Sequence, residues 1–220
     1  MTRPSSLRRA ALAVLATLAF VGGARAASVY TPDDFFHAIE VDDGRGVARM
    51  LGTGLDPNLR DPKGQVALFV ALRGESLKAA QVLWEAPGVQ VDAGNDAGET
   101  PLMMAALRSE GDAAQALVAR GAAINKDGWT PLHYAATGGN VKIIRLLLDH
   151  GAKLEARSPN GTTPLMMACR YGSEEAVNAL LAAGADRTLK NDLGMDAAAF
   201  ADSVGRDYLV RKLKPAPAAH

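Results

Sequence analysis

The chain has 220 residues and carries 24 basic and 24 acidic side chains, so its formal net charge is zero at pH 7. Binding to nucleic acid or to an anionic membrane through charge alone requires a basic excess, so this balance argues against both. With 48% hydrophobic residues the chain is apolar enough to bury a core, and its single cysteine excludes an internal disulfide.

Residues 1–26 have the pattern of a cleaved secretory signal peptide. Three arginines precede a mostly apolar run over 10–21, which is shorter than the roughly 20 residues that a membrane span needs. Small residues at 24 and 26 predict cleavage before Ala27. A twin-arginine signal at Arg8-Arg9 is the alternative, although the surrounding residues fit that motif poorly. Cleavage removes four arginines and leaves 20 basic against 24 acidic side chains, so the mature protein has a net charge of −4.

Three segments further along the chain repeat one short motif. They begin at Gly98, Gly128 and Gly161 and read Gly-Glu-Thr-Pro-Leu, Gly-Trp-Thr-Pro-Leu and Gly-Thr-Thr-Pro-Leu. A Gly-Ala pair follows 23 residues after each of these glycines. Such a period is the signature of stacked repeats, because each unit buries its apolar face only against its neighbours.

Each unit predicts two helices followed by a turn. The threonine of the motif can cap the first helix, and the proline after it suits the first helical position. Small residues at matching places in the first helices, such as Ala135-Ala136, allow close packing. The second helix carries apolar residues at i, i+3 and i+4, as in Ile144, Leu147 and Leu148. The glycine of the Gly-Ala pair then ends that helix in a left-handed conformation.

This motif and its period resemble the ankyrin repeat. The resemblance implies an all-α, ankyrin-type helix–turn–helix solenoid with β-hairpin or loop fingers and about six units, including degenerate caps. It covers one domain over 27–214, followed by a disordered tail at 215–220. The units are expected near 31–60, 61–94, 95–125, 126–157, 158–190 and 191–214.

One finger is shorter than the others. Gly121 and Gly128 are separated by seven residues, whereas ten separate the corresponding glycines of the other well-matched fingers. A missing tip would leave a notch beside Trp129, into which a loop of a partner could insert. Neutral deletion in a surface turn is the other explanation.

No pattern in the sequence indicates catalysis, a metal site or a cofactor, so we expect a protein that is not an enzyme. The resemblance implies that His133 is structural and hydrogen-bonds to a neighbouring turn. The methionine pairs at 103–104 and 166–167 offer soft ligands to copper, but packing is their expected role. Cys169 stands where neighbouring units have alanine and is expected to be buried; a redox or intermolecular role is the alternative.

Partners of ankyrin-like stacks dock on the concave side, which the finger tips and the ends of the first helices form. Carried over to this sequence, the candidate protein-binding residues are Arg73, Glu99, Leu107, Arg108, Asp127, Trp129, Arg170 and Tyr171. The three arginines would form a ladder that matches a partner with an acidic face, with the two aromatic residues as further contacts. The alternative is that the arginines only favour the dipoles of the helix ends.

These features predict a non-catalytic, periplasmic module that binds one or a few proteins and is not anchored in the membrane after signal cleavage. The resemblance implies two subtypes: an accessory of a periplasmic enzyme, or an inhibitor or immunity protein directed against an enzyme or toxin. A secreted, effector-like protein that acts on host proteins is the alternative function.

Overall fold

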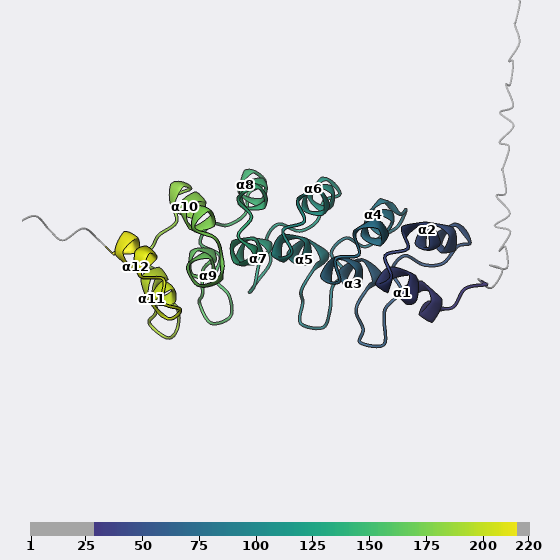
Figure 1. The fold of residues 1–220 in the computed structure, drawn as a ribbon, viewed down its shortest axis with the longest axis horizontal. Helices are drawn as coiled ribbons and strands as arrows, with labels where there is room; N and C mark the ends of the chain where they lie inside the picture. The colour runs from purple at the N-terminus through teal and green to yellow at the C-terminus, as the bar shows by residue number, and fades with distance from the viewer. Residues whose placement is uncertain (1–28, 215–220) are drawn as a thin grey trace, which may run out of the picture.

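The computed structural model describes residues 29–214, which form one elongated stack of helices (Figure 1). This part of the chain contains twelve α-helices, and none of them is both long and apolar enough to cross a membrane. The predicted all-α solenoid of about six units is confirmed. The predicted signal peptide, at 1–26, and the predicted disordered tail, at 215–220, lie outside the described residues.

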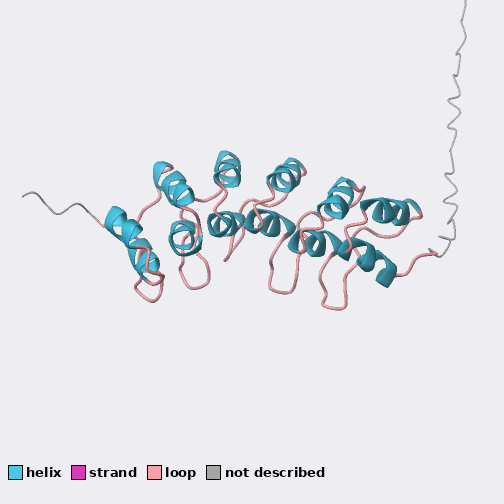
Figure 2. Ribbon diagram, in the orientation of Figure 1, coloured by secondary structure: helices cyan, strands magenta, loops and turns pink. Residues whose placement is uncertain are grey.

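The helices follow one another in six pairs, which place an inner row beside an outer row (Figure 1). The inner helices are α1 (Pro32–Glu40), α3 (Ala67–Arg73), α5 (Pro101–Leu107), α7 (Pro131–Gly138), α9 (Pro164–Tyr171) and α11 (Ala197–Asp202). The outer helices are α2 (Gly44–Gly52), α4 (Leu77–Glu85), α6 (Gly111–Ala119), α8 (Val141–Asp149), α10 (Glu174–Ala182) and α12 (Asp207–Leu213). The fingers, which are the loops joining one pair to the next, project from the inner row, away from the outer row (Figure 2).

Threonine and methionine together cap two of the inner helices. The Oγ1 atoms of Thr100 and Thr163 each accept a hydrogen bond from a backbone N–H, that of Met103 and that of Met166. In return, the backbone N–H groups of the threonines donate to the methionine Sδ atoms at 3.3 and 3.4 Å. Methionine therefore takes the place that glutamate or glutamine has in a capping box. Both side chains are buried, which supports packing rather than metal binding as their role.

Close approach of the inner helices depends on small residues. Ala106, Ala136 and Cys169 are fully buried on the faces where these helices meet. At the end of α7 the backbones come so close that a Cβ atom built on Gly138 would lie 2.6 Å from the carbonyl oxygen of Ala106. Gly172, after α9, is crowded in the same way by the carbonyl oxygen of Ala136. The small residues thus set the spacing between repeats.

The outer helices bury one stripe of side chains and leave the other side in water. In α8, Ile144 and Leu147 are fully buried, whereas Leu148 is half-buried at the edge of the stripe. The core is one continuous cluster along the stack. Left-handed glycines follow the outer helices as predicted, with φ of 84° at Gly121 and 82° at Gly151.

Four full-length fingers close through the same turn. In each, the N–H of a left-handed glycine donates to the carbonyl oxygen three residues earlier, at 2.8–2.9 Å. These glycines are Gly64, Gly98, Gly161 and Gly194, each with φ of 73° or 74°.

The shortened finger is hydrogen-bonded to both of its neighbours. Asn125 lies three residues before Gly128, and its Nδ2 donates to the carbonyl oxygen of Gly151 at 2.8 Å. On the other side, Lys126 Nζ donates to the carbonyl oxygen of Gly98 at 2.6 Å. Bonds to both adjacent fingers therefore fix the place where three residues are missing.

A repeated hydrogen bond joins successive fingers into a row. In each case a side-chain oxygen of one finger accepts from a backbone N–H at the start of the next finger, two residues after its first glycine. The donors and acceptors are Gln90 to Asn58 (2.7 Å), Ala123 to Asp92 (2.8 Å), Lys153 to Asn125 (2.9 Å) and Asp186 to Glu155 (2.7 Å). The shortened finger keeps both of its bonds in this row.

Candidate functional site

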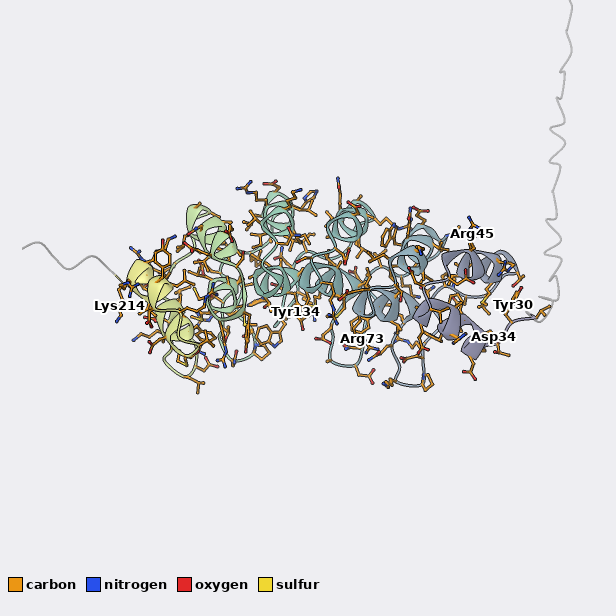
Figure 3. All side chains as sticks on the ribbon, viewed as in Figure 1. Tyr30, Asp34, Arg45, Arg73, Tyr134 and Lys214 are labelled. Carbon is orange, nitrogen blue, oxygen red and sulfur yellow. The ribbon has the colours of Figure 1, made fainter. Side chains whose placement is uncertain are left out.

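The concave face is formed by the fingers together with two positions on each of the inner helices α3, α5, α7 and α9. Six residues after the turn glycine lie Val70, Met104, Tyr134 and Met167, and nine residues after it lie Arg73, Leu107, Thr137 and Arg170. Figure 3 shows the labelled Tyr134 and Arg73 on the side of the inner row from which the fingers project. The middle of this face differs from the rest, because the finger before α7 is short (Figure 1).

A hollow of about 250 Å³ lies at this place, and we call it the central hollow. Its walls come from three successive inner helices, α5, α7 and α9, and from the tryptophan that follows the shortened finger. The lining residues are Leu107, Trp129, His133, Tyr134, Thr137 and Met167. The predicted notch beside Trp129 is therefore lined mainly by apolar and aromatic side chains.

His133 forms part of the wall and is fully buried. Its Nδ1 accepts from the backbone N–H of Thr130 at 3.1 Å, so the hydrogen on its Nε2 is the one donated to the carbonyl oxygen of Thr162, at 2.9 Å. Burial lowers the pKa of His133 below its ordinary value, which keeps the ring neutral. Trp129 packs edge-on against this ring, with the centroids 5.2 Å apart and the planes at 76°.

Tyr134 joins the central hollow to the preceding finger. Its hydroxyl donates to Glu99 Oε1 at 2.6 Å, and Glu99 Oε2 accepts from Asn95 Nδ2 at 2.7 Å. Burial, followed by the hydrogen bond to the carboxylate, raises the pKa of Tyr134 well above its ordinary value. The phenol therefore stays protonated at neutral pH, and the Glu99 carboxylate is held in a fixed position beside the hollow.

The three candidate arginines do not share one register on their helices. Arg73 and Arg170 lie nine residues after the glycine of their units, whereas Arg108 lies ten residues after its glycine. Because one residue is about 100° of helical rotation, Arg108 turns away from the other two. Its guanidinium pairs with the carboxylate of Glu75 at 3.0 Å, in the turn between α3 and α4.

The other two arginines lie over aromatic rings of their own helices. The guanidinium carbon of Arg73 is 5.8 Å from the centroid of the Phe69 ring. That of Arg170 is 5.3 Å from the centroid of Tyr171, whose side chain is 56% exposed. Both arginines are half-buried and remain available at the concave face.

The structure thus brings some of the predicted binding residues together and separates others. Leu107 and Trp129 line the central hollow, and Glu99 lies behind the hydroxyl of Tyr134. Six of the eight predicted residues lie outside the lining: Glu99, Arg73, Arg108, Arg170, Tyr171 and Asp127, the last of which is exposed on the shortened finger. The prediction missed Tyr134 and Met167, which lie six residues after a turn glycine and are half-buried, whereas Met104 at the same position of its repeat is buried.

Within the described residues, Cys169 and the metal-ligating side chains add no reactive or metal-binding site. Cys169 is fully buried, and burial raises the pKa of its thiol to about 12, so it is a poor nucleophile. Within residues 29–214, no group of three or more His, Cys, Asp and Glu side chains is placed to hold a metal ion.

Comparison of the sequence with models of known protein families gives a match to ankyrin repeats. The model of the family described as ankyrin repeats (3 copies) matches residues 35–127 and 110–191. A chain of the solved complex of a predatory endopeptidase from Bdellovibrio bacteriovorus with an immunity protein has a TM-score of 0.71 and 26% sequence identity. That similarity covers 84% of this chain and 98% of the other.

Curated relatives match this chain over a small part of their own length. A putative palmitoyltransferase of Danio rerio is 32% identical over 120 residues, which is 52% of this chain and 18% of the relative. Ankyrin repeat and SAM domain-containing protein 6 of Rattus norvegicus is 34% identical over 113 residues, 50% of this chain and 13% of that protein. The chain thus matches less than a fifth of the length of either relative.

Proposed function

Because the chain belongs to the ankyrin repeat family, we propose that it is a non-catalytic module that binds one partner enzyme through its concave face and inhibits it. The observation that carries this proposal is the central hollow, a fixed, largely apolar depression in the middle of the face on which such stacks bind. Hollows that receive an anchoring side chain are where binding energy concentrates in protein interfaces.

The solved complex supports the inhibitor over the accessory role. It contains an endopeptidase and an immunity protein, and the similarity extends over nearly the whole of the matched chain. We therefore place a peptidase of the cell envelope first among the partner classes. An accessory protein would leave the active site of its enzyme open, whereas an inhibitor would cover it.

The arginines that share one register give the proposed contact its charge. Arg73 and Arg170 stand in different repeats on the concave face, so acidic groups of the partner would meet them on either side of the central hollow. Arg108 contributes less, since its guanidinium is already paired with Glu75 at 3.0 Å.

The test is a titration of enzyme activity. An envelope endopeptidase from the source organism is mixed with residues 27–220, and peptide hydrolysis and the mass of the complex are measured together. We expect loss of activity at a 1:1 ratio, and loss of this effect in the variant Trp129→Ala/Arg170→Ala/Tyr171→Ala. Arg145→Ala, on the exposed side of α8, is the matched control and should inhibit like the parent. A complex that leaves activity unchanged would favour the accessory role, and equal inhibition by parent and triple variant would refute the concave site.

Export to the periplasm is part of the proposal. Its support is the basic and apolar pattern of residues 1–26 and the small residues before Ala27. Sequencing the N-terminus of the protein from cell fractions tests it, with Ala27 expected as the first residue in the periplasmic fraction. Uncleaved protein confined to the cytoplasm would contradict it.

A further inference from the structure

We propose that the central hollow receives the side chain of an arginine carried on a loop of the protein partner. This inference rests on the proposed function and names the chemistry of the contact at its centre. The size, the walls and the charge of the hollow each contribute one part of the argument.

The size of the hollow fits one side chain. At about 250 Å³ it is smaller than the roughly 300–1,000 Å³ of pockets that enclose small molecules and cofactors. It is open to the concave face, and the finger that would cover it is three residues shorter than its neighbours. A loop of a partner can therefore reach the hollow where a full-length finger would stand.

The walls suit a long side chain with an apolar stem and a flat, positive end. Leu107 and Met167 come from the helices on either side of α7 and offer apolar contacts to the methylene groups. Trp129 and Tyr134 add two aromatic rings, and aromatic faces attract cations within about 6 Å. A guanidinium stacks on such rings through its plane, which an ammonium cannot do. The buried His133 is neutral and does not repel a cation.

On the side of the preceding finger, away from Arg170, an unpaired negative charge lies next to the hollow. Glu99 is held by Tyr134 and by Asn95, at 2.6 and 2.7 Å. A carboxylate has about four acceptor positions, so two donors leave capacity for a guanidinium. Residues 29–214 contain three ion pairs, and neither Glu99 nor the exposed Asp127 belongs to any of them. Lys126, which precedes Asp127 in the chain, donates to the carbonyl oxygen of Gly98 and forms an ion pair with neither carboxylate.

The experiment compares arginine with its neutral isostere, citrulline. The peptides acetyl-Gly-Gly-Arg-Gly-Gly-amide and acetyl-Gly-Gly-citrulline-Gly-Gly-amide are titrated into residues 27–220, and the tryptophan indole N–H signals are followed by NMR. The chain has two tryptophans, and Trp84 is only 9% exposed, so Trp129→Phe assigns the signals. We expect the arginine peptide to shift the Trp129 signal saturably, with an affinity at least about fivefold above that of citrulline.

Two variants test the carboxylate. Glu99→Gln should lower the affinity for the arginine peptide by about fivefold and leave the affinity for the citrulline peptide unchanged. Asp96→Asn, an exposed carboxylate of the same finger, is the matched control and should bind like the parent. An unchanged Trp84 signal verifies that each variant is folded.

Three results would overturn the proposal. Equal affinity for both peptides would identify the hollow as a site for a neutral side chain. Arginine binding that Glu99→Gln does not weaken would remove the carboxylate from the contact, and the absence of any saturable shift of Trp129 would exclude the anchor site. Inhibition of an endopeptidase that still depends on Trp129 would then leave the proposed function standing without an arginine anchor.

Discussion

Tyr134 and Glu99, which lie 35 residues apart in the chain, form a hydrogen bond of 2.6 Å between an inner helix and the preceding finger. The bond ties two repeats together at the middle of the concave face. It also places the charge of Glu99 beside a largely apolar hollow.

Tyr134→Phe should therefore weaken the stack without changing its shape. A half-buried hydrogen bond to a charged group is lost, so we expect the free energy of unfolding to fall by about 1–2 kcal/mol. Because the folded pKa of Tyr134 is raised, the contribution of the bond is complete below the unfolded pKa of about 10 and declines at higher pH. Urea unfolding at pH 7 and above pH 10 measures both effects. Tyr171→Phe, with an exposed ring, is the control, and a loss as large as that of Tyr134→Phe would contradict the assignment.

Because His133 is buried, we expect the free energy of unfolding to depend on pH in the acidic range. Its pKa is lowered in the folded state, so the unfolded chain takes up the proton first as the pH falls. Stability should be complete above about pH 6.5 and should decline as the pH falls below that value. His133→Gln should flatten this decline in urea unfolding between pH 7 and 5, and an unchanged slope would show that other groups cause it.

Leu147 and Leu148 are neighbours on α8 with different burial. Leu147→Ala removes a fully buried side chain and should lower the free energy of unfolding by about 2–5 kcal/mol. Leu148 is half-buried, so Leu148→Ala should cost less than half as much. Denaturant unfolding of the two variants gives the comparison. A loss below about 0.5 kcal/mol for Leu147→Ala would be incompatible with its place in the core.

Gly138 sets the distance between α5 and α7. The Cβ of Gly138→Ala would lie 2.6 Å from two backbone carbonyl oxygens, those of Ala106 and Leu107. Since backbone atoms cannot move aside easily, we expect a loss of about 1–3 kcal/mol. Gly52→Ala, at the end of α2, meets no atom within 4 Å and should be neutral or stabilising by up to about 1 kcal/mol. In thermal unfolding, the midpoint temperature of Gly138→Ala should fall, whereas that of Gly52→Ala should stay unchanged or rise.

Cys169 should be unreactive while the protein is folded. Its thiol is fully buried with a pKa raised to about 12, so almost none of it is the reactive thiolate at pH 8. A thiol reagent should label Cys169 only after urea is added past the unfolding transition. Rapid labelling of the native protein would restore the redox alternative.

The regular part of the molecule follows from local sequence, and the central hollow does not. Turn glycines, threonine caps and small residues at helix contacts recur at fixed spacings, so the helix pairs and their stacking can be predicted from one repeat. His133 forms the bond to a neighbouring turn that the resemblance implies. The methionine caps were outside the prediction, because Met103 and Met166 do in this chain what glutamate or glutamine does in the usual motif.

The hollow depends instead on differences between repeats. The short finger is visible in the sequence, but the residues that face it belong to three repeats and carry a different side chain in each. The pairing of Tyr134 with Glu99 requires the distance between a finger and the next inner helix, which no spacing within one repeat supplies. In the same way, Arg108 belongs to a predicted row of arginines by residue type but misses it by one position on the helix.

The row of bonds between fingers has a consequence for exchange with solvent. The amide hydrogens of Gln90, Ala123, Lys153 and Asp186 lie in exposed loops, yet each is donated to an oxygen of the preceding repeat. An exposed amide exchanges slowly only while its acceptor stays in place, so each of these four hydrogens reports whether two adjacent repeats are docked. Deuterium uptake at these four amides would thus measure separately how stably each pair of adjacent repeats stays docked. The amide that exchanges first would show where the stack opens first.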